Sequence, residues 1–500
     1  MNTPAGILAL SFALCGGQAF ASCTDLGAMK LAGVTIAGAR ESAPFSGTDP
    51  MMGAYATARS ICRVTGTILP AIKFEVWLPT PADWNGKLQG VGNGGVAGSI
   101  AEASLAAGVN RGYATVSSNL GHDGNPIDFR FAVGHPELVA DWGHRATHEM
   151  TVAAKQIAGA YYGKPPAHAY FTGCSGGGRQ GLMEAARYPA DYDGIVAGDP
   201  TANFTRLTLG GRLWEAMATL KDPARYIPAG KIPTIARATA KACADGTGVI
   251  DDPRRCAFDP AALLCKAGDA DDCLTAPQVT ALKAIYAGST NSKGERIYPG
   301  YMPGGELGPM GWSAYVAGAG PKKASQFLYA DGFARFMVKE NPDFDSLGFD
   351  YDRDMPAALA KLSKTIDASD PDLKPYARHG GKLIQYHGWS DPGVSPLNSV
   401  DYYEQVARVY GKPSADFYRL FMVPGMQHCT GGPGADHFDA LAALEQWVEQ
   451  GKAPDRIVAA HLKDGAVERT RPLCPYPQVA RWDGKGSQDA AENFRCEQPE

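Results

Sequence analysis

Short segments of this chain alternate between apolar and polar residues, which is typical of half-buried strands. We expect strands over 74–79, 87–91, 113–118 and 167–171, and helices over 101–108, 143–162 and 182–187. Strands that alternate with helices in this way predict a mainly parallel sheet with helices on both faces. Residues 22 to about 70 show little periodicity, and we expect them to cap this core.

The alternation of strands and helices stops after Pro200. Residues 203–367 contain four cysteines, several Pro-Gly turns and segments rich in aromatic residues. The alternation then resumes, with strands expected over 382–386 and 417–423 and helices over 398–410 and 437–450. We therefore expect a catalytic domain formed by residues 22–202 and 368–500, with a lid domain, 203–367, inserted into it.

The first 21 residues carry no charge and contain an apolar segment from Ile7 to Leu14. They end in Ala19-Phe20-Ala21, an A-x-A cleavage motif, so residues 1–21 predict a signal peptide and a secreted or periplasmic protein. No later segment has the roughly 18 apolar residues of a membrane helix, so we expect no membrane partner. The net charge of −5 comes from interspersed charges of both signs, which argues against a nucleic-acid partner.

Ten cysteines remain after the predicted cleavage site, and an even number in an exported chain predicts disulfides. Sequence does not determine connectivity. Proximity along the chain favours Cys23 with Cys62, Cys243 with Cys256, Cys265 with Cys273, and Cys474 with Cys496. Cys174 and Cys429 are left over.

A G-x-S-x-G motif lies between an expected strand and an expected helix. Its three positions are Gly173, Ser175 and Gly177. In that context a sharp turn exposes the serine hydroxyl as a nucleophile, and glycine is needed where side chains would clash with the backbone. Free N–H groups at the start of the helix can stabilise a developing negative charge.

A nucleophilic serine needs a general base, and the base needs an acid that orients it. Asp391 follows the first of the two late strands and His428 follows the second, which is the order Ser, acid, His of the α/β-hydrolase fold. We therefore predict that fold, with Ser175, Asp391 and His428 as catalytic residues. His387 is the alternative base, but a structural role in its loop is favoured.

Cys174 immediately precedes the predicted nucleophile, and Cys429 immediately follows the predicted base. If Ser175 and His428 meet, these two cysteines come within reach of a disulfide. That bond would tether the nucleophile directly to its base.

These motifs together resemble the tannase and feruloyl esterase family. The resemblance rests on Gly173-Cys174-Ser175, Trp389-Ser390-Asp391, His428-Cys429, Asn93-Gly94-Gly95, His148-Glu149-Met150, the segment 188–195 and the segment 302–306. It implies an α/β-hydrolase core with a lid and the hydrolysis of esters of aromatic acids. It also implies an oxyanion hole formed by the backbone N–H groups of Gly176 and of Gly94 or Gly95.

The same resemblance implies a possible calcium site, because members of the family bind calcium through spaced aspartates between two lid cysteines. Here the segment from Cys243 to Cys256 is short and keeps only Asp245, Asp251 and Asp252. Calcium takes six to eight oxygen ligands, so a loop closed by a disulfide is favoured over a weak metal site. We expect no required cofactor.

We expect specificity to depend on the lid, whose flat aromatic side chains could stack on an aromatic acyl group. The candidates for substrate contact are Trp312, Phe333 and Arg335, with Tyr315, Phe327, Tyr329 and Phe336 as further aromatic residues of the lid. The predicted partner is thus a small aromatic ester of the hydroxycinnamic or gallic type. The alternatives are a terephthalate monoester hydrolase and, from another class, a non-catalytic surface or carbohydrate-binding protein.

Overall fold

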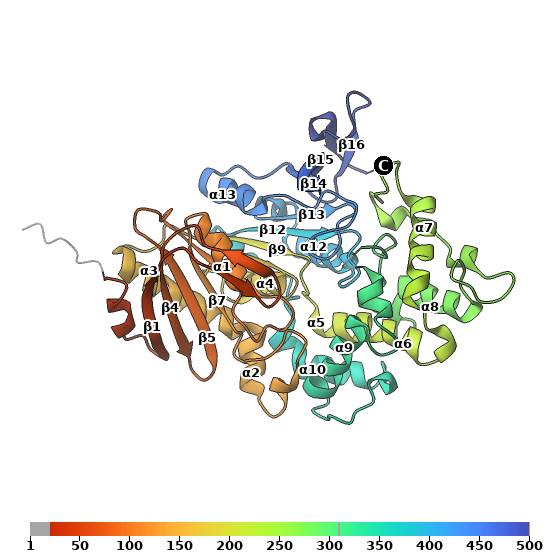
Figure 1. The fold of residues 1–500 in the computed structure, drawn as a ribbon, viewed down its shortest axis with the longest axis horizontal. Coiled ribbons are helices and arrows are strands. Elements are labelled where there is room, and N and C mark those ends of the chain that lie inside the picture. The colour runs from red at the N-terminus through yellow and green to blue at the C-terminus, as the bar shows by residue number, and fades with distance from the viewer. Residues whose placement is uncertain (1–20, 309–310, 500) are drawn as a thin grey trace, which may run out of the picture.

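A nine-stranded sheet forms the centre of the molecule in the computed structural model, which describes residues 21–308 and 311–499 (Figure 1). The strand order is β1-β4-β5-β7-β6-β8-β9-β12-β13. The strands are β1 (Val34–Ser42), β4 (Ile61–Ile68), β5 (Ile72–Pro79), β6 (Lys87–Val91), β7 (Ala114–Ser118), β8 (His168–Cys174), β9 (Gly194–Gly198), β12 (Lys382–Gly388) and β13 (Tyr418–Val423). The six strands from β7 to β13 pair in parallel, whereas β1, β4 and β5 are antiparallel. The predicted α/β fold is confirmed.

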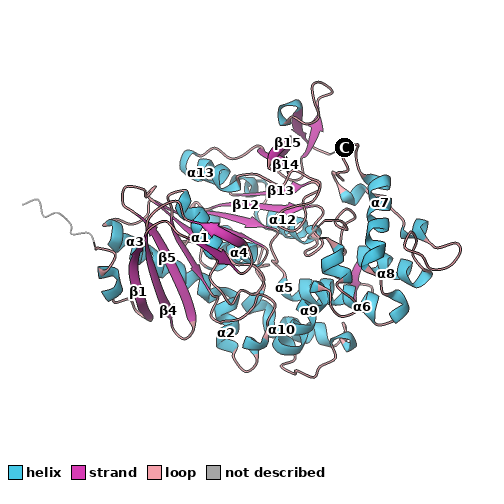
Figure 2. Ribbon diagram, viewed as in Figure 1, coloured by secondary structure: helices cyan, strands magenta, loops and turns pink. Residues whose placement is uncertain are grey.

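Helices pack on both faces of this sheet (Figure 2). They are α1 (Glu102–Asn110), α2 (Pro136–Ala140), α3 (Ala146–Tyr162), α4 (Gly176–Arg187), α11 (Lys374–His379), α12 (Pro396–Tyr410) and α13 (Ala440–Gln450). Successive strand residues point to opposite faces. Phe171 of β8 therefore joins the apolar core formed with α3, α4 and α12, whereas Tyr170 joins the core formed with α13.

Residues 203–367, called the insert below, are mainly helical and lie to one side of the sheet (Figure 1). They form α5 (Phe204–Arg206), α6 (Trp214–Leu220), α7 (Ile232–Cys243), α8 (Ala276–Ala287), β10 (Gly288–Thr290), β11 (Arg296–Pro299), α9 (Ser325–Gly332) and α10 (Asp354–Ile366). Apolar residues between Ile227 and Ala317 form a core of their own. Residues of α9 and α10 instead pack into the main core beside α3 and α4. One part of the insert therefore has its own core, and another part packs against the main core. That residues 203–367 form a separate lid domain stays a prediction.

Besides the antiparallel pair of β10 and β11 in the insert, the described residues form three two-stranded antiparallel sheets outside the main sheet. They are β2 (Ser46–Asp49) with β3 (Gly53–Ala56), β14 (Ile457–Lys463) with β15 (Ala466–Leu473), and β16 (Val479–Trp482) with β17 (Phe494–Glu497). Among the described residues, no helix combines the length and apolarity needed to cross a membrane. The predicted signal peptide, except Ala21, lies outside the described residues.

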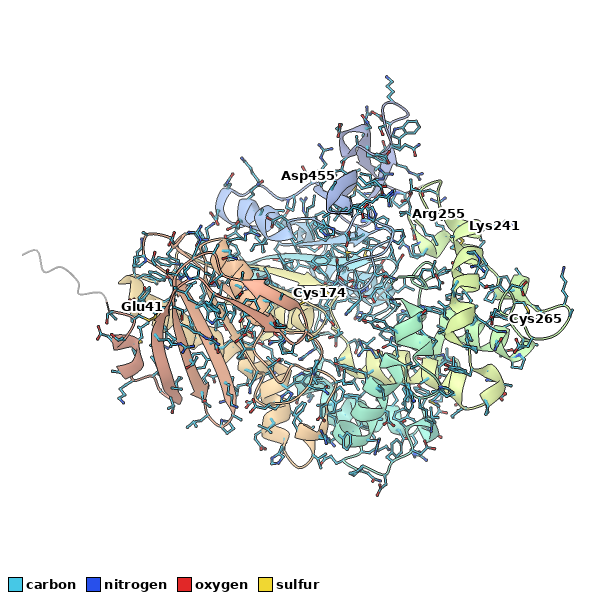
Figure 3. All side chains as sticks on the ribbon, viewed as in Figure 1. Glu41, Cys174, Lys241, Arg255, Cys265 and Asp455 are labelled. Atoms are coloured by element: carbon cyan, nitrogen blue, oxygen red, sulfur yellow. A yellow bond between two sulfur atoms is a disulfide. The ribbon has the colours of Figure 1, made fainter. Side chains whose placement is uncertain are left out.

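The described residues form five disulfides: four join the cysteines paired by proximity along the chain, and the fifth joins Cys174 to Cys429. Cys174 lies near the middle of the molecule, and Cys265 lies at the outer edge of the insert (Figure 3). The disulfide of Cys174 with Cys429 therefore joins distant parts of the chain near the centre of the fold. The disulfide of Cys265 with Cys273 closes a local loop of the insert.

Candidate active site

Ser175 occupies a sharp turn between the end of β8 and the start of α4. Its backbone has φ 62° and ψ −119°, a conformation that is strained for any residue but glycine. A Cβ atom on Gly173 would lie 2.6 Å from the carbonyl carbon of Gly177, so the turn requires glycine there. The turn thus presents the serine side chain at the carboxyl end of the parallel strands.

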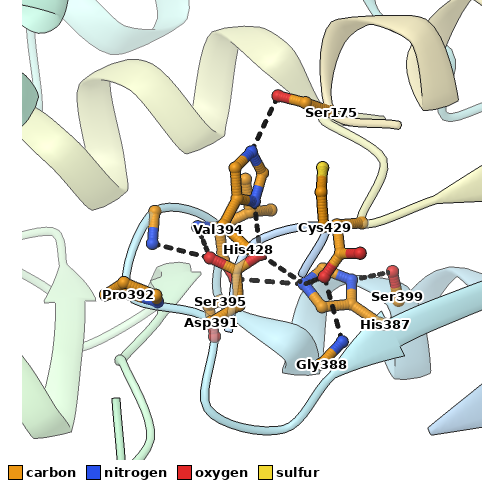
Figure 4. Close-up of polar contacts among 12 residues, drawn as sticks. Ser175, His387, Gly388, Asp391, Pro392, Val394, Ser395, Ser399, His428 and Cys429 are labelled. Atoms are coloured by element: carbon orange, nitrogen blue, oxygen red, sulfur yellow. Dashed lines mark hydrogen bonds and ion pairs between the residues drawn. The ribbon is translucent and has the colours of Figure 1, made fainter. Parts of the chain in front are cut away.

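The three predicted catalytic residues lie in one hydrogen-bonded row (Figure 4). His428 Nε2 lies 2.9 Å from Ser175 Oγ, and His428 Nδ1 lies 2.6 Å from Asp391 Oδ2. With the proton on Nδ1, His428 donates to Asp391, and its Nε2 accepts the serine proton. The geometry suits removal of the hydroxyl proton as Ser175 attacks a carbonyl carbon.

Asp391 is fully buried, and both of its carboxylate oxygens have donors. The N–H groups of Gly393 and Val394 donate to Oδ1 at 2.7 and 2.9 Å. Burial alone would raise the pKa of Asp391, but His428 and His387 outweigh burial and hold the pKa well below its usual value. Asp391 is therefore an anion at neutral pH.

His387 also contacts Asp391, but it does not face the serine. Its Nε2 lies 3.2 Å from Asp391 Oδ2 and 3.1 Å from the carbonyl oxygen of Val394, and its Nδ1 lies 2.6 Å from Ser399 Oγ. These contacts use both ring nitrogens inside the fold. They fit the predicted structural role of His387, although it lies in β12 and not in a loop. Residues 389–394, which follow β12, are called the acid loop below.

The backbone N–H groups predicted to form the oxyanion hole lie close to the serine. A Cβ atom on Gly176 would lie 2.4 Å from the carbonyl oxygen of Gly95, so the nucleophile turn and the Gly-rich loop are in direct contact. Within the described part of the chain, no acceptor lies within hydrogen-bonding distance of the N–H groups of Gly94, Gly95 or Gly176. Asn93 fixes the loop by donating to the carbonyl oxygens of Ser99 and Ser118, both at 2.9 Å.

The disulfide between Cys174 and Cys429 joins the residue before Ser175 to the residue after His428. The two Cα atoms are 6.0 Å apart, and the bond closes a loop of 255 residues. In the chain-entropy account, closing a loop of this length stabilises the fold by roughly 5 kcal/mol. It also limits how far the serine and its base can separate.

We expect replacement of both Cys174 and Cys429 by Ala to lower kcat by about 10- to 100-fold and to lower the unfolding free energy, because the shared positioning of Ser175 and His428 is lost. Urea unfolding and initial rates measure the two effects. The matched control removes Cys265 and Cys273, whose loop spans 8 residues, and should leave kcat unchanged. Equal kcat values for the two double variants would contradict the positioning role.

The residues predicted to contact substrate lie elsewhere, and the structure corrects that prediction. Trp312 and Phe333 have no exposed surface and pack in apolar cores. Arg335 donates to the carbonyl oxygen of Pro342 and to Asp331. Tyr315 is the aromatic residue of the insert that reaches the site, since its ring centroid lies 6.4 Å from that of His428.

Two residues of the insert hold the acid loop, and sequence reasoning missed both. Gln326 Nε2 donates to the carbonyl oxygens of Pro392 and Gly393 at 3.0 and 3.3 Å, and Arg212 donates to that of Gly393 at 3.4 Å. Both side chains are buried. No local pattern indicates these contacts, because the partners are far apart in the sequence.

Among the described residues, the three aspartates considered for calcium do not form a cluster with ligand atoms within 4.8 Å of one another. Asp245 accepts from the N–H and hydroxyl of Thr247 at 2.8 and 2.6 Å, and Asp252 forms an ion pair with Arg254 at 2.7 Å. Among the described residues, Asp251 alone of the three has no hydrogen-bond donor. These three carboxylates do not fit calcium, which takes six to eight oxygen ligands.

We expect addition of a chelator to leave the melting temperature unchanged, because a cation that does not bind cannot stabilise by mass action. Thermal unfolding with EDTA, and with EDTA followed by excess calcium, measures this. A fall of several degrees that calcium reverses would contradict the prediction.

The chain is similar to a known family model, to two bacterial proteins and to a solved fungal structure. A family model described as "Tannase and feruloyl esterase" matches residues 56–497. An uncharacterized esterase of Xanthomonas campestris pv. campestris is 38% identical over 98% of this chain and 93% of its own. Mono(2-hydroxyethyl) terephthalate hydrolase of Piscinibacter sakaiensis is 33% identical over 93% and 88% of the two chains. The crystal structure of feruloyl esterase B from Aspergillus oryzae superimposes with a TM-score of 0.86 at 28% identity, over 95% and 99%.

Proposed function

Because the chain belongs to the tannase and feruloyl esterase family and is an ester hydrolase, we propose that it is a serine esterase that acts on esters of aromatic acids. The observation that carries the proposal is the hydrogen-bonded row of Ser175, His428 and Asp391. The earlier alternative of a non-catalytic carbohydrate-binding protein is not supported by this family membership.

Hydrolysis proceeds in two steps. Ser175 Oγ attacks the ester carbonyl while His428 takes its proton, and the carbonyl oxygen becomes an oxyanion facing the N–H groups of Gly176 and of Gly94 or Gly95. His428 returns the proton to the departing alcohol, which leaves an acyl group on Ser175. Water, activated by His428, then releases the acid. Each oxyanion donor contributes roughly 3 kcal/mol to stabilising the transition state.

This chemistry requires no metal or organic cofactor, because the nucleophile, base and acid are all side chains. The predicted signal peptide and the five disulfides support export to an oxidising compartment. We therefore propose that the enzyme works outside the cell or in the periplasm.

Among the described residues of the insert, Tyr315 is the aromatic residue whose ring lies beside His428, and an aromatic acid fits this position. Tyr315 is half-buried, and its ring also contacts Gly393 of the acid loop. We propose that the aromatic ring of an acyl group bound to Ser175 stacks on Tyr315. The relatives named feruloyl esterase B and mono(2-hydroxyethyl) terephthalate hydrolase support the same substrate class.

We expect Tyr315→Ala to lower kcat/KM about tenfold for methyl ferulate and less than threefold for p-nitrophenyl acetate, since loss of one aromatic contact costs about 1 to 1.5 kcal/mol. Tyr315→Phe keeps the ring and should behave as the parent does. Phe336→Ala, which removes another half-buried aromatic ring of the insert, is the control. An unchanged ratio of the two kcat/KM values in Tyr315→Ala would contradict the assignment.

Initial rates on methyl ferulate, methyl gallate and mono(2-hydroxyethyl) terephthalate test the substrate class. p-Nitrophenyl acetate has a better leaving group than the methyl esters, so its kcat/KM is corrected for that difference. After this correction, we expect methyl ferulate or methyl gallate to have a higher kcat/KM than p-nitrophenyl acetate. Preference for the terephthalate monoester would favour the second candidate. Hydrolysis of acetate esters alone would contradict an aromatic acid as the substrate.

A further inference from the structure

Asp199 connects the end of β9 to the end of β12, directly before the acid loop. Its N–H donates to the carbonyl oxygen of Tyr386 at 2.8 Å, and its Oδ1 accepts from the N–H of Gly388 at 2.9 Å. Tyr386 and Gly388 belong to β12, and Gly388 lies three residues before Asp391. The side chain of Asp199 therefore holds β12 at the point where the chain turns toward the catalytic acid.

The same segment contacts the nucleophile turn. Ser175 donates its N–H to the carbonyl oxygen of Gly198 at 2.9 Å and accepts one from Thr201 at 3.3 Å. Asp199 Oδ2 lies 3.5 Å from the Sγ atom of Cys174, in the disulfide that links the serine to its base. Asp199 thus lies between the two loops whose separation sets the distance from serine to acid.

The backbone of Asp199 is strained, and its side chain is fully buried. Its φ of 36° lies in the left-handed region that favours glycine, which costs on the order of 1 kcal/mol or more. A strained residue persists only where its surroundings hold it in place. The hydrogen bonds of Asp199 to Tyr386 and Gly388 supply that restraint.

Asp199 faces another buried carboxyl group. Its side chain, His387 and Asp391 have ligand atoms within 4.8 Å of one another, and all three are buried. His387 Nε2 is the nearest basic atom, 3.7 Å from Asp199 Oδ1, and the described residues place no lysine or arginine in ion-pair contact with Asp199. Two carboxylates this close cannot both ionise readily without a compensating charge.

We propose that Asp199 is a positioning residue that joins the acid loop to the nucleophile turn as a neutral carboxylic acid, so that the buried negative charge under His428 lies on Asp391. This rests on the proposed function of Ser175, His428 and Asp391. Burial raises the pKa of Asp199 well above its usual value, and the charge of Asp391 raises it further, against the opposing effect of His387.

If Asp199 is neutral, its substitution by Asn and its substitution by Ala should have different effects. Asp199→Asn keeps an oxygen that accepts from Gly388 and is neutral, as the protonated acid is. We expect it to retain kcat within threefold and to keep the pH profile of kcat/KM between about pH 6 and 9. Asp199→Ala loses the acceptor, so the acid loop shifts, and we expect kcat to fall 10- to 100-fold with KM within twofold of the parent.

The control is Asp367→Ala. Asp367 accepts from the N–H and hydroxyl of Thr205 at 2.8 and 3.0 Å, and within the described part of the chain it forms no hydrogen bond with Asp391 or His428. Its loss should lower the melting temperature without lowering kcat. If Asp199→Ala does not fold, Asp199→Ser, whose hydroxyl is too short to reach Gly388, is measured with the same expectation.

A second readout does not depend on the substrate. The proton between His428 Nδ1 and Asp391 gives a far-downfield proton NMR signal, which should shift or broaden in Asp199→Ala and stay in place in Asp199→Asn and Asp367→Ala. A wrong substrate class leaves this signal informative, so failure of the proposed function and failure of this inference can be distinguished.

Three results would overturn the inference. The first is a kcat for Asp199→Ala within twofold of the parent, with an unshifted downfield signal. The second is an equal loss of kcat in Asp199→Ala and Asp367→Ala, which would reduce the role of Asp199 to general stability. The third is a loss in Asp199→Asn as large as that in Asp199→Ala, which would show that the ionised carboxylate is required.

Discussion

Ser175→Ala is expected to lower the rate of ester hydrolysis by roughly 10⁴- to 10⁶-fold, because no other group can form the acyl intermediate. The residual rate should come from substrate binding and the oxyanion hole. The fold should survive, since the variant loses one hydroxyl whose partner, His428, keeps its bond to Asp391. Single-turnover rates and thermal unfolding measure the two effects.

The matched control for this variant is Ser313→Ala, which removes an exposed hydroxyl from the insert. It should hydrolyse esters at the parent rate. If Ser175→Ala keeps more than a hundredth of the parent activity in a preparation free of the parent enzyme, the nucleophile lies elsewhere.

Asp391→Asn is expected to lower kcat by about 10⁴-fold, because an amide cannot stabilise the imidazolium or hold the proton on Nδ1 of His428. Asp391 accepts from His428 through one oxygen and from two backbone N–H groups through the other. An amide nitrogen in either place would put two donors against each other. The loss should therefore fall on kcat, with a small change in KM.

Asp439→Asn is the control for Asp391→Asn, because it removes the same negative charge at another site. Asp439 caps α13 by accepting from the N–H of Ala442 at 2.9 Å, and asparagine caps a helix equally well. Its activity and stability should match those of the parent. If Asp391→Asn behaves in the same way, the acid of this site is another carboxylate, and Asp199 would be the nearest candidate.

The central strands β6, β7, β8, β12 and β13 could be predicted from the sequence as short apolar segments, whereas β9 (Gly194–Gly198) was not predicted. The first part of the chain could not be predicted either. Residues 22–70 were expected to cap the core, but β1 and β4 extend the sheet instead, which makes that prediction wrong. β1 alternates between half-buried and exposed residues only over its first five positions, and a bulge between Ile36 and Gly38 interrupts its register.

The reacting groups could be predicted because each adjoins a strand end with its own local motif. The substrate residues could not, because an aromatic residue in a core and one in a binding site look alike in sequence. Trp312 and Phe333 belong to cores, whereas Tyr315, three residues after Trp312, reaches the site.

The contacts of the insert also change how specificity can be tested. Gln326 and Arg212 hold the acid loop, and α9 and α10 complete the main core. Deleting residues 203–367 would therefore remove support from Asp391 and expose apolar surface. Point variants such as Tyr315→Ala separate recognition from catalysis, and a deletion does not.

The most direct test of the central claim is to trap the acyl-enzyme. The enzyme is mixed with excess methyl ferulate, quenched in acid within the first turnovers, digested and analysed by peptide mass spectrometry. We predict a feruloyl adduct on the peptide that contains Ser175 and no such adduct in Ser175→Ala. Rapid hydrolysis of the ester with the label on another residue would contradict the account.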